Sequence, residues 1–226
     1  MARGEFARRV VGVTVAMLAL LLLAAVVGRF SARPPRRPNV IMISVDTMRV
    51  DRLGVYGHSD ARSPNIDGLA KGGTLFTQAT TPFPRTTPAL ASLFTGLWPQ
   101  HHGSREVAQG IHDDIPTLGE VLRRNGYATL GICGNATASA RQGLDRGFDR
   151  FFSPPELKPI SARAITNRSL KEAALMPGDK PLFLWSHYID PHFPYRPPKQ
   201  WPAQPEAGPC RDLISTTGRD RWLIGE

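Results

Sequence analysis

The residues with the clearest chemical potential in this chain follow short apolar runs. Asp46 comes directly after the apolar, β-branched run from Asn39 to Val45. A carboxylate at the point where such a run opens into a polar loop is well placed to hold a hard cation. Taken alone, an aspartate at this place is more often a turn former or a helix cap. The nearby Asp51 is interpreted as a solvated loop acid.

A second candidate is the pair of threonines in PFPRTTPALASLFTG, residues 82–96. Pro88 favours the first turn of a helix, Thr87 favours its cap and Gly96 favours its end. Thr86 and Thr87 are therefore expected at a helix N-terminus, where free N–H groups and the helix dipole attract anions. A hydroxyl there could attack a phosphate or a sulfate. Simple capping is the competing interpretation.

The third candidate is the segment HYIDPHFPYRPP, in which His187 ends an apolar run and His192 follows in the loop. A histidine can donate a proton to a leaving oxygen near neutral pH. A lone histidine before proline and aromatic residues is usually only packed. Two histidines with Asp190 within six residues keep a functional role open beside that interpretation.

Alternating strands and helices are expected to position these three segments. Short apolar runs predict strands at 39–45, 75–79, 127–133 and 182–188. Helices are predicted after a Ser63 cap, at 117–125 with a Thr117–Glu120 capping box and a Gly126 end, and at 161–176. The alternation predicts an α/β fold, a mostly parallel sheet flanked by helices. Because parallel sheets bind ligands beyond the carboxyl ends of their strands, Asp46, Thr86 and His187 are predicted to converge on one edge.

The first 38 residues are expected to lie outside this fold. A basic N-terminus, residues 1–9, precedes 19 uncharged residues from Val10 to Gly28, about the length that a helix needs to cross hydrocarbon. We expect a transmembrane anchor, and a cleaved signal sequence is the alternative. Arginines flank both ends of this run, so the positive-inside rule gives no orientation. Residues 29–38 form a Pro/Arg linker of the extended, semi-rigid kind.

The charge of the chain argues against a nucleic-acid partner. The formal net charge is +9, but residues 1–37 hold seven arginines and one acid, which leaves only +3 for the other 189 residues. A nucleic-acid binder should show a basic stripe with interleaved aromatic residues in its folded part. Two cysteines, Cys133 and Cys210, are too few for a disulfide framework and are interpreted as small buried hydrophobes.

Together these segments resemble the sulfatase family of the alkaline phosphatase superfamily, over about residues 38–198. The matching stretches occur in the family's order: PNVIMISVDTMRVDRLGVYG, SPNIDGLAKGGTLFTQA, TTPALASLFTGLWPQHHG, IPTLGEVLRRNGYATLGI, GLDRGFDRF and HYIDPHFPY. The resemblance implies an alkaline phosphatase-like domain at 39–198, outside the cytoplasm, that acts on sulfate or phosphate esters. It implies Asp46 as a ligand of a divalent metal, Thr86 as the nucleophile and His192 near the leaving group, with His187 in the same cleft.

Departures from the family pattern bear on the chemistry. Sulfatases convert a cysteine or serine at the nucleophile position to formylglycine, which a threonine cannot form because its Cβ carries a methyl group. Thr86 therefore favours the related phosphotransferases that modify envelope lipids or polymers and use threonine directly. The metal implied is calcium for a sulfatase, and zinc, manganese or magnesium for a phosphotransferase. Leu90 stands where the family has an arginine, and GICGNATAS replaces a Gly-Lys-Trp-His type motif.

The resemblance also implies that the metal site is half built. In the family, a later Asp-His or Asp-Asn segment completes that site, but the 34 residues after His192 contain no histidine. Residues 199–226, with Asp212 and Asp220, are interpreted as a loop or frayed tail. We expect the N-terminal portion of the domain only, as a fragment that does not catalyse alone or that a partner chain completes in trans. A noncatalytic binding module is the alternative of another class.

Overall fold

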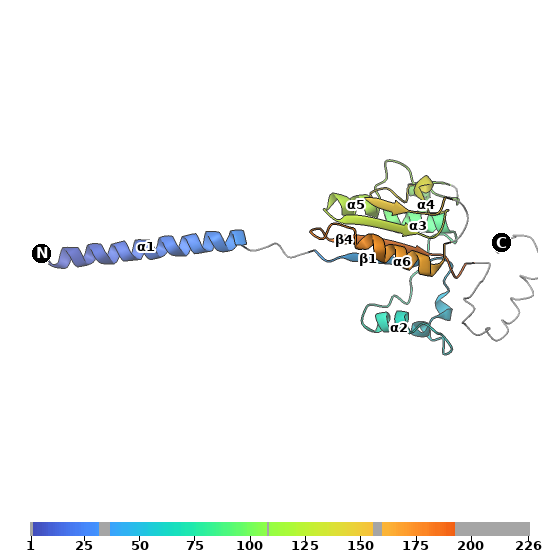
Figure 1. Ribbon diagram of the computed structural model, residues 1–226, viewed down its shortest axis with the longest axis horizontal. Helices are drawn as coiled ribbons and strands as arrows, with labels where there is room; N and C mark the ends of the chain where they lie inside the picture. The colour runs from blue at the N-terminus through green and yellow to red at the C-terminus, as the bar shows by residue number, and fades with distance from the viewer. Residues whose placement is uncertain (1, 32–36, 108, 156–159, 193–226) are drawn as a thin grey trace, which may run out of the picture.

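The structure is a computed structural model that describes residues 2–31, 37–107, 109–155 and 160–192. The predicted tail at 199–226, Cys210 and the middle of the predicted linker lie outside these residues. Within them strands and helices are mixed, as the sequence predicts, but they do not alternate strictly, because several helices separate the first strand from the second and only a 3-10 turn separates the second strand from the third. The arrangement is shown in Figure 1.

A parallel sheet of four strands forms the centre of the domain (Figure 1). Its strands are β1 (Val40–Val45), β2 (Ala128–Cys133), β3 (Arg150–Phe152) and β4 (Leu182–Tyr188), in the spatial order β1-β4-β2-β3. β4 is therefore central, with Val45 of β1 opposite Tyr188 and Cys133 of β2 opposite His187. The prediction of an α/β fold with a mostly parallel sheet is confirmed, and the carboxyl ends of β1, β4 and β2 lie side by side.

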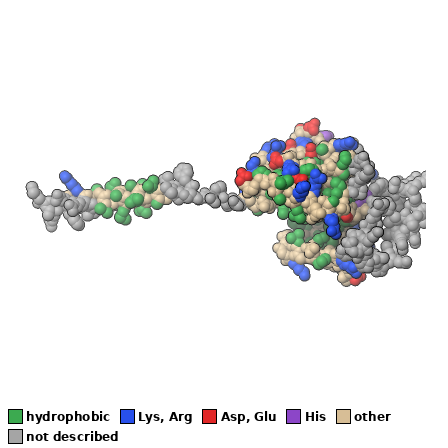
Figure 2. Space-filling model, viewed as in Figure 1, with side chains coloured by type: hydrophobic (Ala, Val, Ile, Leu, Met, Phe, Trp, Pro, Cys, Tyr) green, Lys and Arg blue, Asp and Glu red, His purple; other side chains and the backbone are tan. Residues whose placement is uncertain are grey.

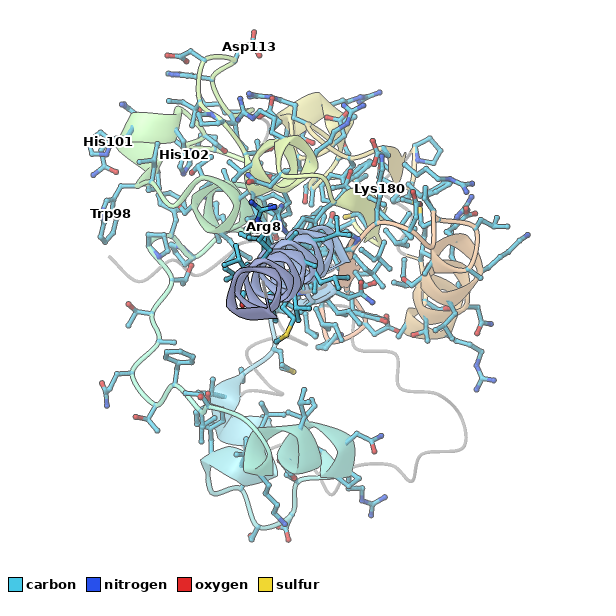
Figure 3. The ribbon with its side chains drawn as sticks, turned by 90° about the vertical axis from the view of Figure 1, so that its left-hand side faces the viewer. Arg8, Trp98, His101, His102, Asp113 and Lys180 are labelled. Atoms are coloured by element: carbon cyan, nitrogen blue, oxygen red, sulfur yellow. The ribbon has the colours of Figure 1, made fainter. Side chains whose placement is uncertain are left out.

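Helices cover both faces of this sheet. On one face, Leu90 and Phe94 of α3 (Thr86–Thr95) pack with Phe183 and Trp185 of β4, and α5 (Leu118–Arg124) contacts β2. On the other face, Ile165 of α6 (Ala162–Ala173) packs against Leu130, Ile132 and Leu184. Figure 3 shows α6 on the opposite side of the sheet from α3. Because β2 is buried on both faces, its sequence is apolar without alternation.

Most predicted helices form close to their predicted bounds. α5 carries the predicted capping box, in which Thr117 Oγ1 accepts from Glu120 N and the Glu120 side chain accepts from Thr117 N. Gly126, just beyond this helix, has a φ of 83°, in the left-handed region expected of a terminating glycine. Ser63 precedes α2 (Pro64–Lys71), and Ser161 caps α6.

Two local predictions are wrong. Residues 75–79 form no strand; Leu75 and Phe76 are exposed, and the segment pairs with none of the four described strands. Periodicity cannot distinguish a short strand from an apolar loop when no neighbouring strand is known. Thr87 does not cap α3, because the helix begins at Thr86, two residues earlier than predicted, and Arg85 occupies the cap position. The Thr87 hydroxyl instead lies 2.7 Å from Val107 O and 2.6 Å from Thr137 O.

Shorter elements complete the described fold. These are α4 (Pro99–His102) and the 3-10 turns η1 (Val50–Arg52), η2 (Gly54–Tyr56) and η3 (Ala140–Gln142). Asp51 lies exposed in η1, where it pairs with Arg49, as expected for a loop acid. Cys133 is a buried free thiol, and burial raises its pKa to about 12, in agreement with its interpretation as a small hydrophobe.

A single long helix, α1 (Ala2–Ser31), precedes the domain and extends away from the sheet in Figure 1. Figure 2 shows apolar side chains in green along the middle of this helix. Within the described part of the chain, the structure has no helix with the length and apolar character needed to cross a membrane. Membrane anchoring by residues 10–28 therefore stays a prediction.

Candidate active site

Asp46 is placed by the end of β1. Its backbone N–H donates to Tyr188 O at 2.8 Å, so the residue is still held against β4 where the strand ends. The next residue, Thr47, has a φ of 51°, which turns the chain away from the sheet. The Asp46 side chain is buried, with 9% of the residue exposed. The carboxylate therefore sits at the edge of the sheet where parallel strands bind ligands.

Thr86 is brought to this carboxylate by the start of α3. Its Oγ1 lies 3.0 Å from Asp46 Oδ2 and 3.3 Å from Oδ1, and donates to this carboxylate. The buried Thr87 hydroxyl fixes the same turn of helix through Val107 O and Thr137 O. Sequence analysis predicted that Asp46 and Thr86 converge, and the structure places them in direct hydrogen-bond contact.

His187 lies at the carboxyl end of β4, beside Asp46. Its ring is 2% exposed, and Nδ1 lies 2.9 Å from Ser44 Oγ. Its Nε2 faces Asp46 Oδ2 at 3.7 Å, which is too long for a hydrogen bond. Among the described residues this nitrogen has no hydrogen-bond partner. The predicted convergence of Asp46, Thr86 and His187 is therefore observed.

Asn135 is a member of the site that sequence reasoning missed. Its Nδ2 donates to Asp46 Oδ2 at 2.9 Å, and its Oδ1 accepts from the backbone N–H of Thr137 at 2.9 Å. Because a backbone N–H can only donate, this second contact fixes which way the amide points. Asn135 follows β2 by two residues, so the strand-end rule that singled out Asp46 could have found it.

His192 lies in the turn after β4, half-buried, with its backbone N–H donating to Ile189 O at 2.8 Å. The neighbouring Asp190 is exposed. A role for the His192 side chain near the leaving group stays a prediction.

The environment of Asp46 favours its ionised form. Burial opposes ionisation, but nearby His187 and the hydrogen bonds from Thr86 and Asn135 outweigh it, so the pKa of Asp46 lies below its ordinary value. Asp46 is therefore a carboxylate at neutral pH, and a carboxylate only accepts hydrogen bonds. It polarises the Thr86 hydroxyl and can take its proton.

The described residues offer a divalent cation few ligands. Asp46 and Thr86 present oxygen atoms within 3.3 Å of each other, which suits a hard cation. Among the residues that the structure covers, no cluster of three or more His, Cys, Asp or Glu side chains could hold a metal ion. The expectation of a half-built metal site stays a prediction, because residues 193–226 lie outside the description.

The comparison with known families decides the relationship. The model of the Sulfatase family matches residues 38–212. The chain belongs to the sulfatase family. The matched region includes the sheet and every residue of the candidate site.

Individual sulfatases and their structural neighbours agree with this assignment. Steryl-sulfatase of Mus musculus is 32% identical over 140 residues, which cover 54% of this chain and 22% of that protein. The phosphonate monoester hydrolase of Agrobacterium radiobacter has a TM-score of 0.62 at 23% identity, over 73% of this chain and 43% of that one. A protein in the alkaline phosphatase superfamily from Vibrio parahaemolyticus has a TM-score of 0.59 at 22% identity, over 77% and 46%.

These structural likenesses show that the chain has the fold of the alkaline phosphatase superfamily. The chain spans no more than about a third of the length of the curated relatives it matches, 22% of the first and 32% of N-acetylgalactosamine-6-sulfatase of Canis lupus familiaris.

Proposed function

We propose that this sulfatase-family domain hydrolyses sulfate or phosphate monoesters, with Thr86 as the nucleophile and Asp46 as the acceptor of its proton. The observation that carries the proposal is the 3.0 Å contact between Thr86 Oγ1 and Asp46 Oδ2. A hydroxyl is a weak nucleophile until a neighbouring base or metal activates it. Thr86 has such a base, and it stands in the first turn of α3, where the helix dipole attracts an anion.

The proposed transfer forms one bond and breaks one. Thr86 Oγ1 forms a bond to the phosphorus or sulfur atom while the bond from that atom to the leaving ester oxygen breaks. The Thr86 proton passes to the Asp46 carboxylate, and the leaving oxygen takes a proton from water or from His192. Water then attacks the phosphorus or sulfur atom and displaces Thr86 Oγ1, which takes back the proton held by Asp46, while the proton of the attacking water passes to the solvent or to His192. Because a threonine cannot become formylglycine, a phosphate ester is the better substrate of the two, and an envelope lipid or polymer phosphotransferase is the variant of this chemistry that the residue favours.

A divalent cation would join this site through Asp46 and Thr86 Oγ1. Bound there, it would lower the pKa of the Thr86 hydroxyl and neutralise charge on the transferring group. The oxygen donors favour calcium, magnesium or manganese, and a phosphotransferase site would take zinc as well.

The proposal is tested by ester hydrolysis with the purified protein in the presence of calcium, magnesium, manganese or zinc. Thr86→Val keeps the shape of the side chain and removes the hydroxyl. We expect it to lower the turnover of p-nitrophenyl phosphate about a thousandfold or more. Thr95→Val is the matched control, because Thr95 lies at the other end of α3 and its hydroxyl donates to Ala91 O. Equal, measurable rates from the wild type and Thr86→Val would eliminate the proposed nucleophile, whereas no hydrolysis by the wild type with any of the metals is the result expected if the chain does not catalyse alone.

A second candidate function is a binding module that holds an anionic ester without turnover. It is favoured by the single carboxylate, Asp46, that the described residues bring to the site. Calorimetry with inorganic phosphate distinguishes the two functions. Binding that Thr86→Val weakens, with no ester hydrolysis by the wild type under any of the metals, would support the binding module over the hydrolase.

We propose further that residues 10–28 anchor the protein in a membrane as a single pass, with the domain outside the cytoplasm. The support is the uncharged run in the sequence and the exposure of its large apolar side chains between Val11 and Leu23. Carbonate washing should leave the protein in the membrane fraction, and protease added to intact cells should cut it. Release by carbonate would remove the anchor, and protection from protease would reverse the orientation.

A further inference from the structure

His187 is the one site residue whose polar atom is buried without a partner in the described structure. Its ring is 2% exposed, and Nε2 has no hydrogen-bond partner, with Asp46 Oδ2 3.7 Å away. A buried polar group without a hydrogen-bond partner destabilises the folded protein, so native proteins keep few of them. An unpaired nitrogen at a site edge is therefore a place where a ligand atom is expected.

Two further residues decide which ring nitrogen of His187 carries the hydrogen. Trp185 Nε1 lies 2.9 Å from Ser44 Oγ, and an indole N–H can only donate. Ser44 Oγ also lies 2.9 Å from His187 Nδ1. The structure gives Ser44 Oγ no other partner in the described residues, so its single hydrogen has one acceptor available, the lone pair of His187 Nδ1.

The hydrogen bonds therefore run in one direction, from Trp185 to Ser44 to His187. If His187 Nδ1 carried the hydrogen instead, it would donate to Ser44, and the hydrogen of the half-buried serine would have no acceptor among the described residues. In the neutral ring the remaining hydrogen then sits on Nε2, which faces the site. A nitrogen that carries a hydrogen has no lone pair for a metal ion, so this arrangement makes His187 a donor and not a metal ligand.

The groups around His187 Nε2 indicate which atom can accept its hydrogen bond. Asp46 Oδ2 is already bonded to Thr86 Oγ1 at 3.0 Å and Asn135 Nδ2 at 2.9 Å. His187 Nε2 lies 3.7 Å from the same oxygen, which is beyond hydrogen-bond distance. The reacting hydroxyl and the free N–H therefore flank one carboxylate oxygen, and a tetrahedral anion bound at Thr86 brings its own oxygen atoms next to His187.

We infer that His187 donates a hydrogen bond from Nε2 to an oxygen of the phosphoryl or sulfuryl group bound at Thr86, and that Ser44 is the positioning residue that holds the ring for this contact. This inference rests on the proposed function for the identity of the ligand. The direction of the hydrogen bonds rests on Trp185 and Ser44 alone and is testable without any turnover.

The first experiment reads the His187 tautomer directly. Two-bond 15N–1H correlation spectra of the neutral ring, in protein without added ester, should show the hydrogen on Nε2. Ser44→Ala should move the ring toward a mixture of tautomers, and Ser44→Thr, which keeps the hydroxyl, should restore the wild-type pattern. Ser169→Ala is the matched control, because Ser169 is a buried serine on the α6 face whose hydroxyl bonds to Ser186. A hydrogen on Nδ1 in the wild type would overturn the inference.

The second experiment measures inorganic phosphate binding by calorimetry. His187→Ala should weaken it about 10- to 100-fold, the range expected for one hydrogen bond to a charged group. Ser44→Ala should weaken it by a smaller factor, and Ser169→Ala should leave it unchanged. Unaltered affinity in His187→Ala would overturn the contact. A wild type that keeps the Nε2–H tautomer and binds phosphate through His187 but hydrolyses no ester would refute the proposed function and leave this inference standing.

Discussion

Thr86 Oγ1 lies 3.0 Å from Asp46 Oδ2, although the two residues are 40 positions apart in the chain. The contact joins the carboxyl end of β1 to the first turn of α3. Each residue alone has an ordinary structural explanation, as a turn former or a helix-terminal threonine. Their part-buried contact leaves a polarised hydroxyl at a helix N-terminus, which neither explanation requires.

Asn135 is expected to stabilise the Asp46 carboxylate. Asn135→Ala removes the buried donor to Asp46 and the part-buried acceptor of the Thr137 N–H, so it should cost about 1–3 kcal/mol in the free energy of unfolding. It should also raise the pKa of Asp46, because one of the bonds that favours the charged form is lost. Denaturant titration and 13C carboxyl titration measure the two effects. Asn125→Ala, at an exposed asparagine, is the control and should change the stability by about 0.5 kcal/mol or less. An equal loss in both variants would argue against this role.

Two glycines with the same backbone angle separate backbone strain from steric fit. Gly147 and Gly126 both have a φ of 83°. A Cβ on Gly147 would collide with the backbone of Glu120 and Gly119, whereas a Cβ on Gly126 meets nothing within 4 Å. Gly126→Ala should therefore cost about 1 kcal/mol, and Gly147→Ala about 3 kcal/mol or more. Thermal unfolding of both variants tests this; similar melting temperatures would show that the close approach at Gly147 is absent.

His102 should make the stability of the domain depend on pH. The residue is fully buried in α4, on the side toward α3, where its ring nitrogens bond to Ser92 Oγ and the Ser104 N–H (Figure 3). Burial lowers the pKa of His102 below 6.5, and the nearby His101 and His112 act in the same direction. The unfolded chain therefore takes up this proton more readily than the folded one.

The stability that neutral His102 provides is complete above about pH 6.5 and is lost as the pH falls below that value. Urea unfolding between about pH 8 and pH 5 should show this loss in the wild type. His102→Gln, whose amide does not titrate, should be less stable at pH 8 and should show a flatter profile. Identical slopes in the two proteins would contradict the assignment.

Much of this fold could be predicted because local signals agree with the tertiary structure. The β2 and β4 strands are apolar runs buried in a parallel sheet, whereas the apolar β1 run forms an edge of that sheet with Ile41 and Ile43 exposed. The Thr117–Glu120 box fixes the start of α5 through contacts within one turn. The short β3 strand was not predicted, because three residues carry no periodicity and the strand exists through pairing with β2. A strand was wrongly predicted at 75–79, because this segment has a strand-like composition but pairs with no described strand.

The candidate site could be predicted only in part for a similar reason. Asp46, Thr86 and His187 stand at element ends, which a sequence reveals. Asn135 does so too, but an asparagine after a strand is common in turns, and its role depends on the side chains that face it. The roles of Ser44 and Trp185 follow from the pairing of β1 with β4, which places Ser44 opposite His187.

The most direct test of the central claim is mass spectrometry of Thr86 after the protein is mixed with a phosphate or sulfate monoester and quenched with acid. The account predicts that the peptide containing Thr86 gains one phosphoryl or sulfuryl group on that residue. The same peptide should remain unmodified in Thr86→Val, and Asp46→Asn should gain the group much more slowly. Ester hydrolysis without any modification at Thr86, or an Asp46→Asn variant that is modified as fast as the wild type, would contradict the account.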